Sequence, residues 1–175
     1  LGYNSFLSVL KRPEGVKLKI ISPELDLNLI KSLKNFDYPL EFNSIKHIIN
    51  EVSENLYYKD ENVTIDVQIK DAREFIKSLK KVDIIYQDAF SPKVNKELWT
   101  KEYFEDIKKI INPKGVLTTY SVATPVRCAL YKLGFNLYTH PYENIRKGTI
   151  ASLSELDFEM VDFEEKLKRI ECYTY

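Results

Sequence analysis

Three carboxylates stand where an α/β protein places its chemistry. Glu24, Asp71 and Asp88 each lie at the end of, or just after, a short apolar run that predicts a β-strand. In open α/β sheets, ligands bind outside the carboxyl ends of the strands. An acid after an early strand can accept hydrogen bonds from ribose hydroxyls. Together the three acids suggest a nucleoside-bearing cofactor, although Asp71 alone is explained equally well as the cap of a following helix.

Other residues with chemical potential give weaker signals. His47 lies inside a predicted helix and His140 at the end of a predicted strand, and neither has a Cys or an acid at metal-ligand spacing. We therefore expect no metal site. Cys128 and Cys172 are too few for a disulfide scaffold or a Cys-based zinc site, so we expect Cys128 to be a buried free thiol in a reducing, cytoplasmic protein. Ser121 lacks the glycines of a hydrolase elbow.

Strands and helices must alternate to position the three acids. The hydrophobic spacing predicts strands at 17–22, 62–69, 82–87, 115–121, 135–140 and 148–153, and helices at 25–34, 44–57, 72–80, 100–111, 123–133 and 159–170. We expect Asn43 or Ser44, Asp71 and Thr100 to cap the helices that follow them, Gly134 to end one, and 82–87 to be a buried strand. This order predicts an α/β fold with a mostly parallel sheet. The last two strands leave no room for a helix between them, so we expect an antiparallel final hairpin.

Length and composition fit one globular domain with a real core. The chain has 175 residues, of which 44% are hydrophobic and 30% charged, which excludes wholesale disorder. No apolar run approaches the ~18 residues of a membrane span. We place the domain at 1–153 and an acidic C-terminal extension at 154–175. Residues 93–149 hold ten Lys and Arg against five Asp and Glu. This basic segment fits either a surface that faces a polyanion or a solvated lysine-rich face.

Several short motifs carry a family resemblance that spans residues 1 to about 153. In order along the chain they are Leu1-Gly2-Tyr3-Asn4, Asp71-Ala72-Arg73, Asp88-Ala89-Phe90-Ser91-Pro92 with Asn95 and Trp99, Tyr120-Ser121 followed by Arg127, Leu133-Gly134-Phe135, and Arg146-Lys147-Gly148-Thr149. The chain resembles the methyltransferase domain of MnmC-type proteins, which finish 5-methylaminomethyl-2-thiouridine at the tRNA wobble position. The Asp88–Pro92 element with Trp99 is the most specific part. The family fold is a Rossmann-like sheet, and this chain is expected to lack the first strand, which precedes the glycine turn at Gly2.

The resemblance implies S-adenosyl-L-methionine as cofactor and tRNA as substrate, with no metal and no membrane. Gly2, Tyr3 and Asn4 would lie against the methionine part of the cofactor, Glu24 would hold the ribose, and Asp71 with Ala72 would flank the adenine. Asp88 would be the catalytic acceptor for the incoming amine, next to a substrate-binding set of Phe90, Ser91, Pro92, Lys93, Lys96, Arg127, Arg146 and Lys147. Phe90 or Trp99 could stack on the uridine, and for Trp99 plain packing is the favoured interpretation.

Two other functions remain open from the sequence. An aminopropyltransferase of the spermidine synthase kind shares the fold, the acid after an early strand and the Asp after a later one, but it would need more acids to bind a polyamine. A non-catalytic RNA- or protein-binding remnant of the fold is the third possibility, since the glycine turn of the cofactor site is incomplete.

Overall fold

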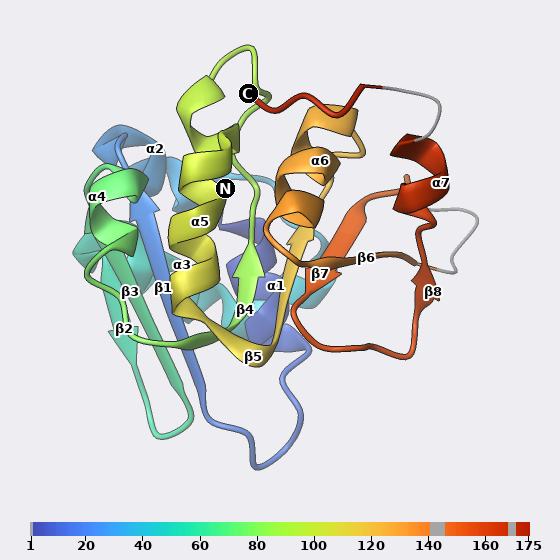
Figure 1. Cartoon of the computed structure of the whole chain (residues 1–175). Coiled ribbons are helices and arrows are strands. Elements are labelled where there is room, and N and C mark those ends of the chain that lie inside the picture. Colours follow the sequence, from blue (N-terminus) through green and yellow to red (C-terminus); the bar gives the residue numbers. More distant parts are fainter. Residues whose placement is uncertain (1, 141–145, 168–170) are drawn as a thin grey trace. The chain divides into compact units, whose positions relative to one another are not determined.

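The computed structural model describes residues 2–140, 146–167 and 171–175, and the chain forms two compact units, Leu1–Phe75 and Ile76–Tyr175 (Figure 1). The boundary falls within helix α4 (Ala72–Ile76). The division into a domain at 1–153 and an acidic extension at 154–175 stays a prediction.

The first unit is built on a three-stranded sheet. β1 (Leu18–Glu24) lies parallel to β3 (Val63–Ile69), and β2 (Tyr57–Lys59) lies antiparallel on the far side of β3. Val63, Ile65 and Val67 of β3 are buried and alternate with less buried residues, as the alternating sequence predicts, whereas Ile69 at the strand end is 38% exposed. The apolar core also takes residues from the helical elements of this unit, which are α1 (Tyr3–Leu10), α2 (Leu27–Ser32), η1 (Leu33–Asn35), η2 (Leu40–Ile45) and α3 (Lys46–Asn55).

The second unit has a five-stranded sheet with the order β4-β5-β7-β6-β8. Its strands are β4 (Val82–Tyr86), β5 (Ile111–Thr119), β6 (Asn136–Thr139), β7 (Thr149–Ser152) and β8 (Glu159–Met160). β4 and β5 are parallel, whereas β7 is antiparallel to both β5 and β6, which confirms the antiparallel final hairpin. The helical elements are η3 (Lys96–Trp99), α5 (Lys101–Ile110), α6 (Thr124–Lys132) and α7 (Phe163–Leu167). Figure 1 shows α5 and α6 next to each other over this sheet, and both contribute to its core.

Local sequence signals explain several element ends. The Thr100 hydroxyl accepts the Tyr103 amide hydrogen at 3.2 Å and so caps α5, as predicted. Gly134 follows α6 with φ of 82°, a left-handed conformation that suits glycine at a helix end. The predicted cap of the 44–57 helix is wrong. A 3₁₀ segment at Leu40–Ile45 includes Asn43 and Ser44 and leads directly into α3. The N-cap residue of α3 is therefore Ile45, whose side chain makes no capping hydrogen bond.

The prediction of a buried 82–87 strand is also wrong in part. Ile84 and Tyr86 of β4 are 58% and 48% exposed. Among the described residues β4 pairs only with β5, and β1 pairs only with β3, so each strand has one paired edge. This sheet order agrees with the expectation that the chain lacks a strand of the family sheet. Helix α1 and the short strands β2 and β8 were not predicted, and α4 and α7 are shorter than the helices expected at 72–80 and 159–170; residues 168–170 lie outside the described residues.

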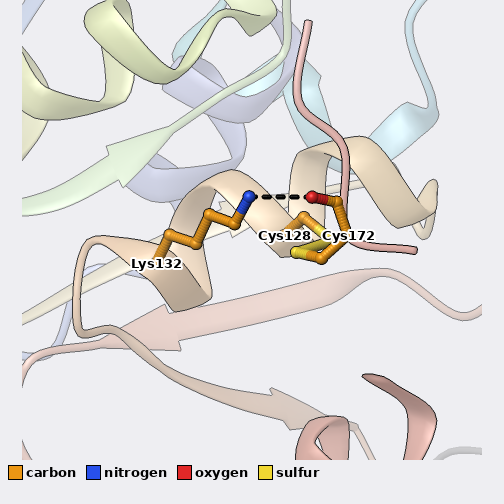
Figure 2. Close-up of a disulfide and its surroundings, with 3 residues drawn as sticks. All are labelled: Cys128, Lys132 and Cys172. Atoms are coloured by element: carbon orange, nitrogen blue, oxygen red, sulfur yellow. Dashed lines mark hydrogen bonds between the residues drawn. A yellow bond between two sulfur atoms is a disulfide. The ribbon is translucent and has the colours of Figure 1, made fainter. Parts of the chain in front are cut away.

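The expectation of a free thiol at Cys128 is wrong. Cys128 is fully buried on α6, as predicted, but it forms a disulfide with Cys172. Figure 2 shows the C-terminal segment passing beside α6, where Lys132 Nζ also donates a hydrogen bond to the Cys172 carbonyl oxygen at 2.7 Å. The bridge closes a sequence separation of 44 residues and ties the chain end to the core of the second unit.

Candidate functional site

Glu24 and Asp71 lie at the same edge of the first unit's sheet. The parallel register pairs Glu24 with Ile69, and the Lys70 amide donates to the Glu24 carbonyl oxygen at 3.0 Å, so both strands end together. This confirms the reasoning that the ends of parallel strands gather the acids that follow them.

The Glu24 carboxylate is half-buried and used on one side only among the described residues. Its Oε1 accepts the amide hydrogens of Leu25 and Asp26 at 2.7 and 3.0 Å. These two bonds orient the side chain and leave Oε2 without a protein donor in the described part of the chain. A fixed carboxylate with an available oxygen is the acceptor that a pair of ribose hydroxyls requires.

Asp71 has a different set of contacts. Its carboxylate accepts the Arg73 amide at 2.8 Å and pairs with the Arg73 guanidinium at 2.6 Å. The predicted capping role is therefore present. Ala72, the first residue of α4, is half-buried beside it. A role for Asp71 and Ala72 at an adenine ring stays a prediction.

The Gly2 segment is packed against the first unit's own core. Gly2 has φ of 66°, and a Cβ at this position would meet Phe6 at 3.0 Å and Leu33 at 3.3 Å. Packing alone thus accounts for a glycine here. Tyr3 is exposed and its ring lies 5.1 Å from that of Phe42, while Asn4 lies in the first turn of α1. Contact of these residues with the cofactor's methionine part stays a prediction.

In the second unit, three loops gather at one edge of the sheet. Asp88 follows β4, Tyr120 follows β5, and Gly148 precedes β7, which pairs with β5 through Thr119 and Thr149. The Tyr120 hydroxyl donates to the Ala89 carbonyl oxygen at 3.0 Å, which joins the first two loops. Asp88 is exposed at this edge, as is Phe90.

A hydrogen-bond network holds the third loop. Gly148 approaches the backbone so closely that a Cβ would lie 2.6 Å from the Thr119 carbonyl oxygen. The Arg127 guanidinium donates to Thr149 Oγ1 at 2.9 Å and to the Gly148 carbonyl oxygen at 3.1 Å. Thr149 Oγ1 in turn donates to the Ser121 carbonyl oxygen at 2.6 Å. Burial lowers the pKa of Arg127, although an arginine stays charged at neutral pH.

The structure thus separates the five basic residues of the predicted substrate-binding set into two groups. Arg127 is half-buried and bonded within the protein, where it fixes the loop that carries Arg146 and Lys147. The other four basic residues are exposed, and they are Lys93, Lys96, Arg146 and Lys147. Ser91 and Pro92 are half-buried in the Asp88 loop, where the Ser91 carbonyl oxygen accepts the amides of Val94 and Asn95. Contact of any of these residues with RNA stays a prediction.

Trp99 and Tyr120 have a structural role that sequence reasoning missed. Trp99 is fully buried, as the packing interpretation predicted, but its Nε1 also donates to the Phe90 carbonyl oxygen at 2.6 Å. The sequence signal was available, because both residues belong to the motifs that carry the family resemblance. Nothing in their spacing, however, showed that they contact the Asp88 loop.

The fold and these motifs define a class of protein. The chain belongs to the family of S-adenosyl-L-methionine-dependent methyltransferases, whose family model matches residues 41–154, more than half of the chain.

Its relatives include MnmC proteins, which confirms the resemblance. The chain is 32% identical over 174 residues to an uncharacterized protein of Methanocaldococcus jannaschii, an alignment that spans 97% of this chain and 48% of the relative. It is 29% identical over 109 residues to the tRNA 5-methylaminomethyl-2-thiouridine biosynthesis bifunctional protein MnmC of Pseudomonas savastanoi pv. phaseolicola, covering 59% of this chain and 16% of that protein. The crystal structure of MnmC2 from Aquifex aeolicus superimposes with a TM-score of 0.81 at 32% identity, over 97% of this chain and 55% of that one. The chain thus spans about half the length of its long relatives or less.

The residues present fit the ribose end of the family's cofactor. Glu24 offers an oriented carboxylate at the carboxyl edge of β1, and Asp71 stands at the same edge. The described residues contain no cluster of His, Cys, Asp and Glu that could hold a metal ion. None of the described helices has both the length and the apolar character needed to cross a membrane.

Proposed function

We propose that this protein transfers a methyl group from S-adenosyl-L-methionine to the aminomethyl group of 5-aminomethyl-2-thiouridine at the tRNA wobble position, and that it acts in the cytoplasm. The observation that carries the proposal is the exposed Asp88 on a loop fixed at the carboxyl edge of a methyltransferase sheet. The MnmC relatives support the choice of a tRNA uridine as substrate.

The cofactor, when bound, supplies a methyl group that is electrophilic because it is attached to a sulfonium. In the proposed site, Glu24 accepts hydrogen bonds from the ribose hydroxyls, with Gly2, Tyr3 and Asn4 along the methionine part and Asp71 and Ala72 at the adenine. The methyl transfer itself is an in-line displacement, so most of the protein's task is to position the reacting groups.

Asp88 has a defined task towards the acceptor. An alkylamine has a pKa of about 10 and is mostly protonated at neutral pH, so its lone pair must be exposed before it can attack. The Asp88 carboxylate would accept an N–H hydrogen bond and take the proton that blocks the amine lone pair. The freed lone pair would then point at the methyl carbon, whose bond to sulfur breaks as the C–N bond forms. The exposed ring of Phe90 offers a surface on which the uridine base can stack.

The charges around Asp88 favour a nucleic acid over a polyamine. Four exposed cations come from the loops at this edge and from the segment that follows Asp88, namely Lys93, Lys96, Arg146 and Lys147. These cations attract phosphates and repel the ammonium groups of a polyamine. The arrangement therefore supports tRNA methylation rather than aminopropyl transfer.

Single-turnover methylation tests the proposal. The substrate is tRNA from cells that lack the final wobble methylation, the enzyme is the full-length protein, and the product is 5-methylaminomethyl-2-thiouridine. Asp88→Asn should lower the rate about 10²–10⁴-fold, the usual contribution of a positioned acid or base. Asp83→Asn is the matched control, because Asp83 is an exposed acid near the other end of the same strand, bonded to Asn112. The proposal fails if the parental protein does not methylate this tRNA.

A further inference from the structure

Two side chains hold consecutive backbone carbonyls of the Asp88 loop. The Tyr120 hydroxyl donates to the Ala89 carbonyl oxygen at 3.0 Å, and Trp99 Nε1 donates to the Phe90 carbonyl oxygen at 2.6 Å. Tyr120 comes from the end of β5 and Trp99 from η3. The loop that follows Asp88 is thus attached to two separate elements of the second unit.

The two holding side chains also support each other. Their rings are 5.8 Å apart at 76°, an edge-to-face arrangement that aromatic pairs favour. Trp99 is 0% exposed and cannot move without disturbing the core, so it is a rigid base for Tyr120, which is 39% exposed.

The residue before Asp88 is fixed in the same way. Gln87 is buried. Its backbone N–H donates to the Thr118 carbonyl oxygen at 2.9 Å, and its side-chain Nε2 donates to the Leu98 carbonyl oxygen at 2.7 Å. Asp88 therefore has an anchored residue on each side, Gln87 before it and Ala89 after it. A carboxylate between two anchored neighbours has little backbone freedom, although it is exposed.

Packing explains the Trp99 ring but not the Tyr120 hydroxyl. A phenylalanine at position 120 would make the same ring contact with Trp99, whereas only a tyrosine can reach the Ala89 carbonyl oxygen. The hydroxyl also stays protonated as a donor at neutral pH, since burial and the negative charge of Asp88 raise the pKa of Tyr120, against an opposing effect of Arg146.

We propose that Tyr120 and Trp99 are positioning residues for the methyl transfer, which they promote by holding the Asp88 carboxylate where the incoming amine must bind. This inference rests on the proposed function and extends it to residues that do not touch the reacting atoms. Positioning matters because a displacement of about 1 Å can cost about 10²-fold in rate.

Tyr120→Phe is the sharpest test, because it removes one oxygen atom and leaves the ring. In single-turnover methylation, its rate should fall about 10–100-fold with little change in cofactor affinity. Tyr131→Phe is the matched control, because the Tyr131 hydroxyl also makes one hydrogen bond in this unit, to Glu164 at 3.0 Å. This variant should leave the methylation rate unchanged. The double variant Tyr120→Phe/Asp88→Asn should be no slower than Asp88→Asn alone, because Tyr120 acts through Asp88.

Hydrogen exchange supplies a readout that needs no activity. The Val94 and Asn95 amides both donate to the Ser91 carbonyl oxygen within the loop, and their exchange should accelerate in Tyr120→Phe but not in Tyr131→Phe. A parental rate of methylation in Tyr120→Phe, additive losses in the double variant, or unchanged exchange of both amides would overturn the inference. Absence of methylation by the parental protein would instead refute the proposed function, and the exchange measurement would still decide whether Tyr120 holds the loop.

Discussion

The Cys128–Cys172 disulfide should supply a large share of the second unit's stability. Chain entropy predicts that closing a loop stabilises the folded state more as the loop lengthens, and a sequence separation of 44 residues corresponds to about 4 kcal/mol at 25 °C. Domains are stable by only about 5–15 kcal/mol, so reduction should lower the unfolding midpoint strongly. The contact of Lys132 with the Cys172 carbonyl oxygen should weaken too, since reduction releases the chain end.

Urea unfolding of the full chain with and without reductant measures this loss. The chain has a single tryptophan, Trp99, which is fully buried in the second unit, so its fluorescence follows that unit alone. The free energy of unfolding from this signal should fall by about 4 kcal/mol, or less if the reduced state retains structure. Hydrogen exchange of the Val67 amide, which donates to the Leu56 carbonyl oxygen in the first unit, should be much less affected.

The double variant Cys128→Ser/Cys172→Ser is the control for side effects of the reductant. Its Trp99 unfolding curve should match that of the reduced parental protein and should not respond to reductant. Identical midpoints for the oxidised and reduced parental protein would refute the reasoning, because the closed loop would then contribute nothing to stability.

Four further predictions concern the site and its frame. Raising the pH should partly restore methylation by Asp88→Asn in a pH–rate profile, because more of the acceptor amine is then neutral, and a flat profile would leave Asp88 as a loop former only. The four exposed cations of the site are Lys93, Lys96, Arg146 and Lys147. When they are replaced together, the slope of log K for tRNA binding against log salt concentration should flatten. An unchanged slope would place the RNA-binding surface elsewhere. Gly148→Ala should cost about 1–3 kcal/mol in Trp99-monitored unfolding, because its Cβ would lie 2.6 Å from the Thr119 carbonyl oxygen, and an unchanged midpoint would contradict that close approach. Hydrogen bonds from the backbone amides of Asn62 and Val63 lower the pKa of Asp60. The first unit should therefore lose stability as the pH falls from the ordinary Asp range, near 4, through that lowered pKa. In a Tm–pH series, Asp60→Asn should reduce this loss.

Much of the fold could be predicted because its elements carry local signals. Alternation in Val63–Ile69, the Thr100 cap and Gly134 after α6 are properties of a few adjacent residues, and the structure confirms them. The burial of β4 could not be predicted in the same way. An apolar run shows that a strand favours burial, but not which segment covers it, and in the described residues only β5 pairs with it. The disulfide was missed for a related reason, since 44 residues separate its cysteines and spacing does not determine pairing.

The three acids show where sequence reasoning about the site ends. Each follows a strand, so the sequence assigns all three to ligand-binding edges with the same argument. The structure gives each a different environment. Glu24 is oriented by two backbone amides, Asp71 is paired with Arg73, and Asp88 is exposed on an anchored loop.

Environment, and not position after a strand, decides what each carboxylate can do. An acid paired with a guanidinium is a poor proton acceptor, because the cation stabilises its charged form. An oriented acid with one available oxygen suits a neutral diol. An exposed acid with anchored neighbours can meet a cationic amine from solvent at a fixed place. The environment of Asp88 depends on contacts with Tyr120 and Trp99, which lie 31 and 9 residues away from the carbonyls they hold. These long-range hydrogen bonds are the part of the proposed site that a strand-by-strand analysis of the sequence does not contain.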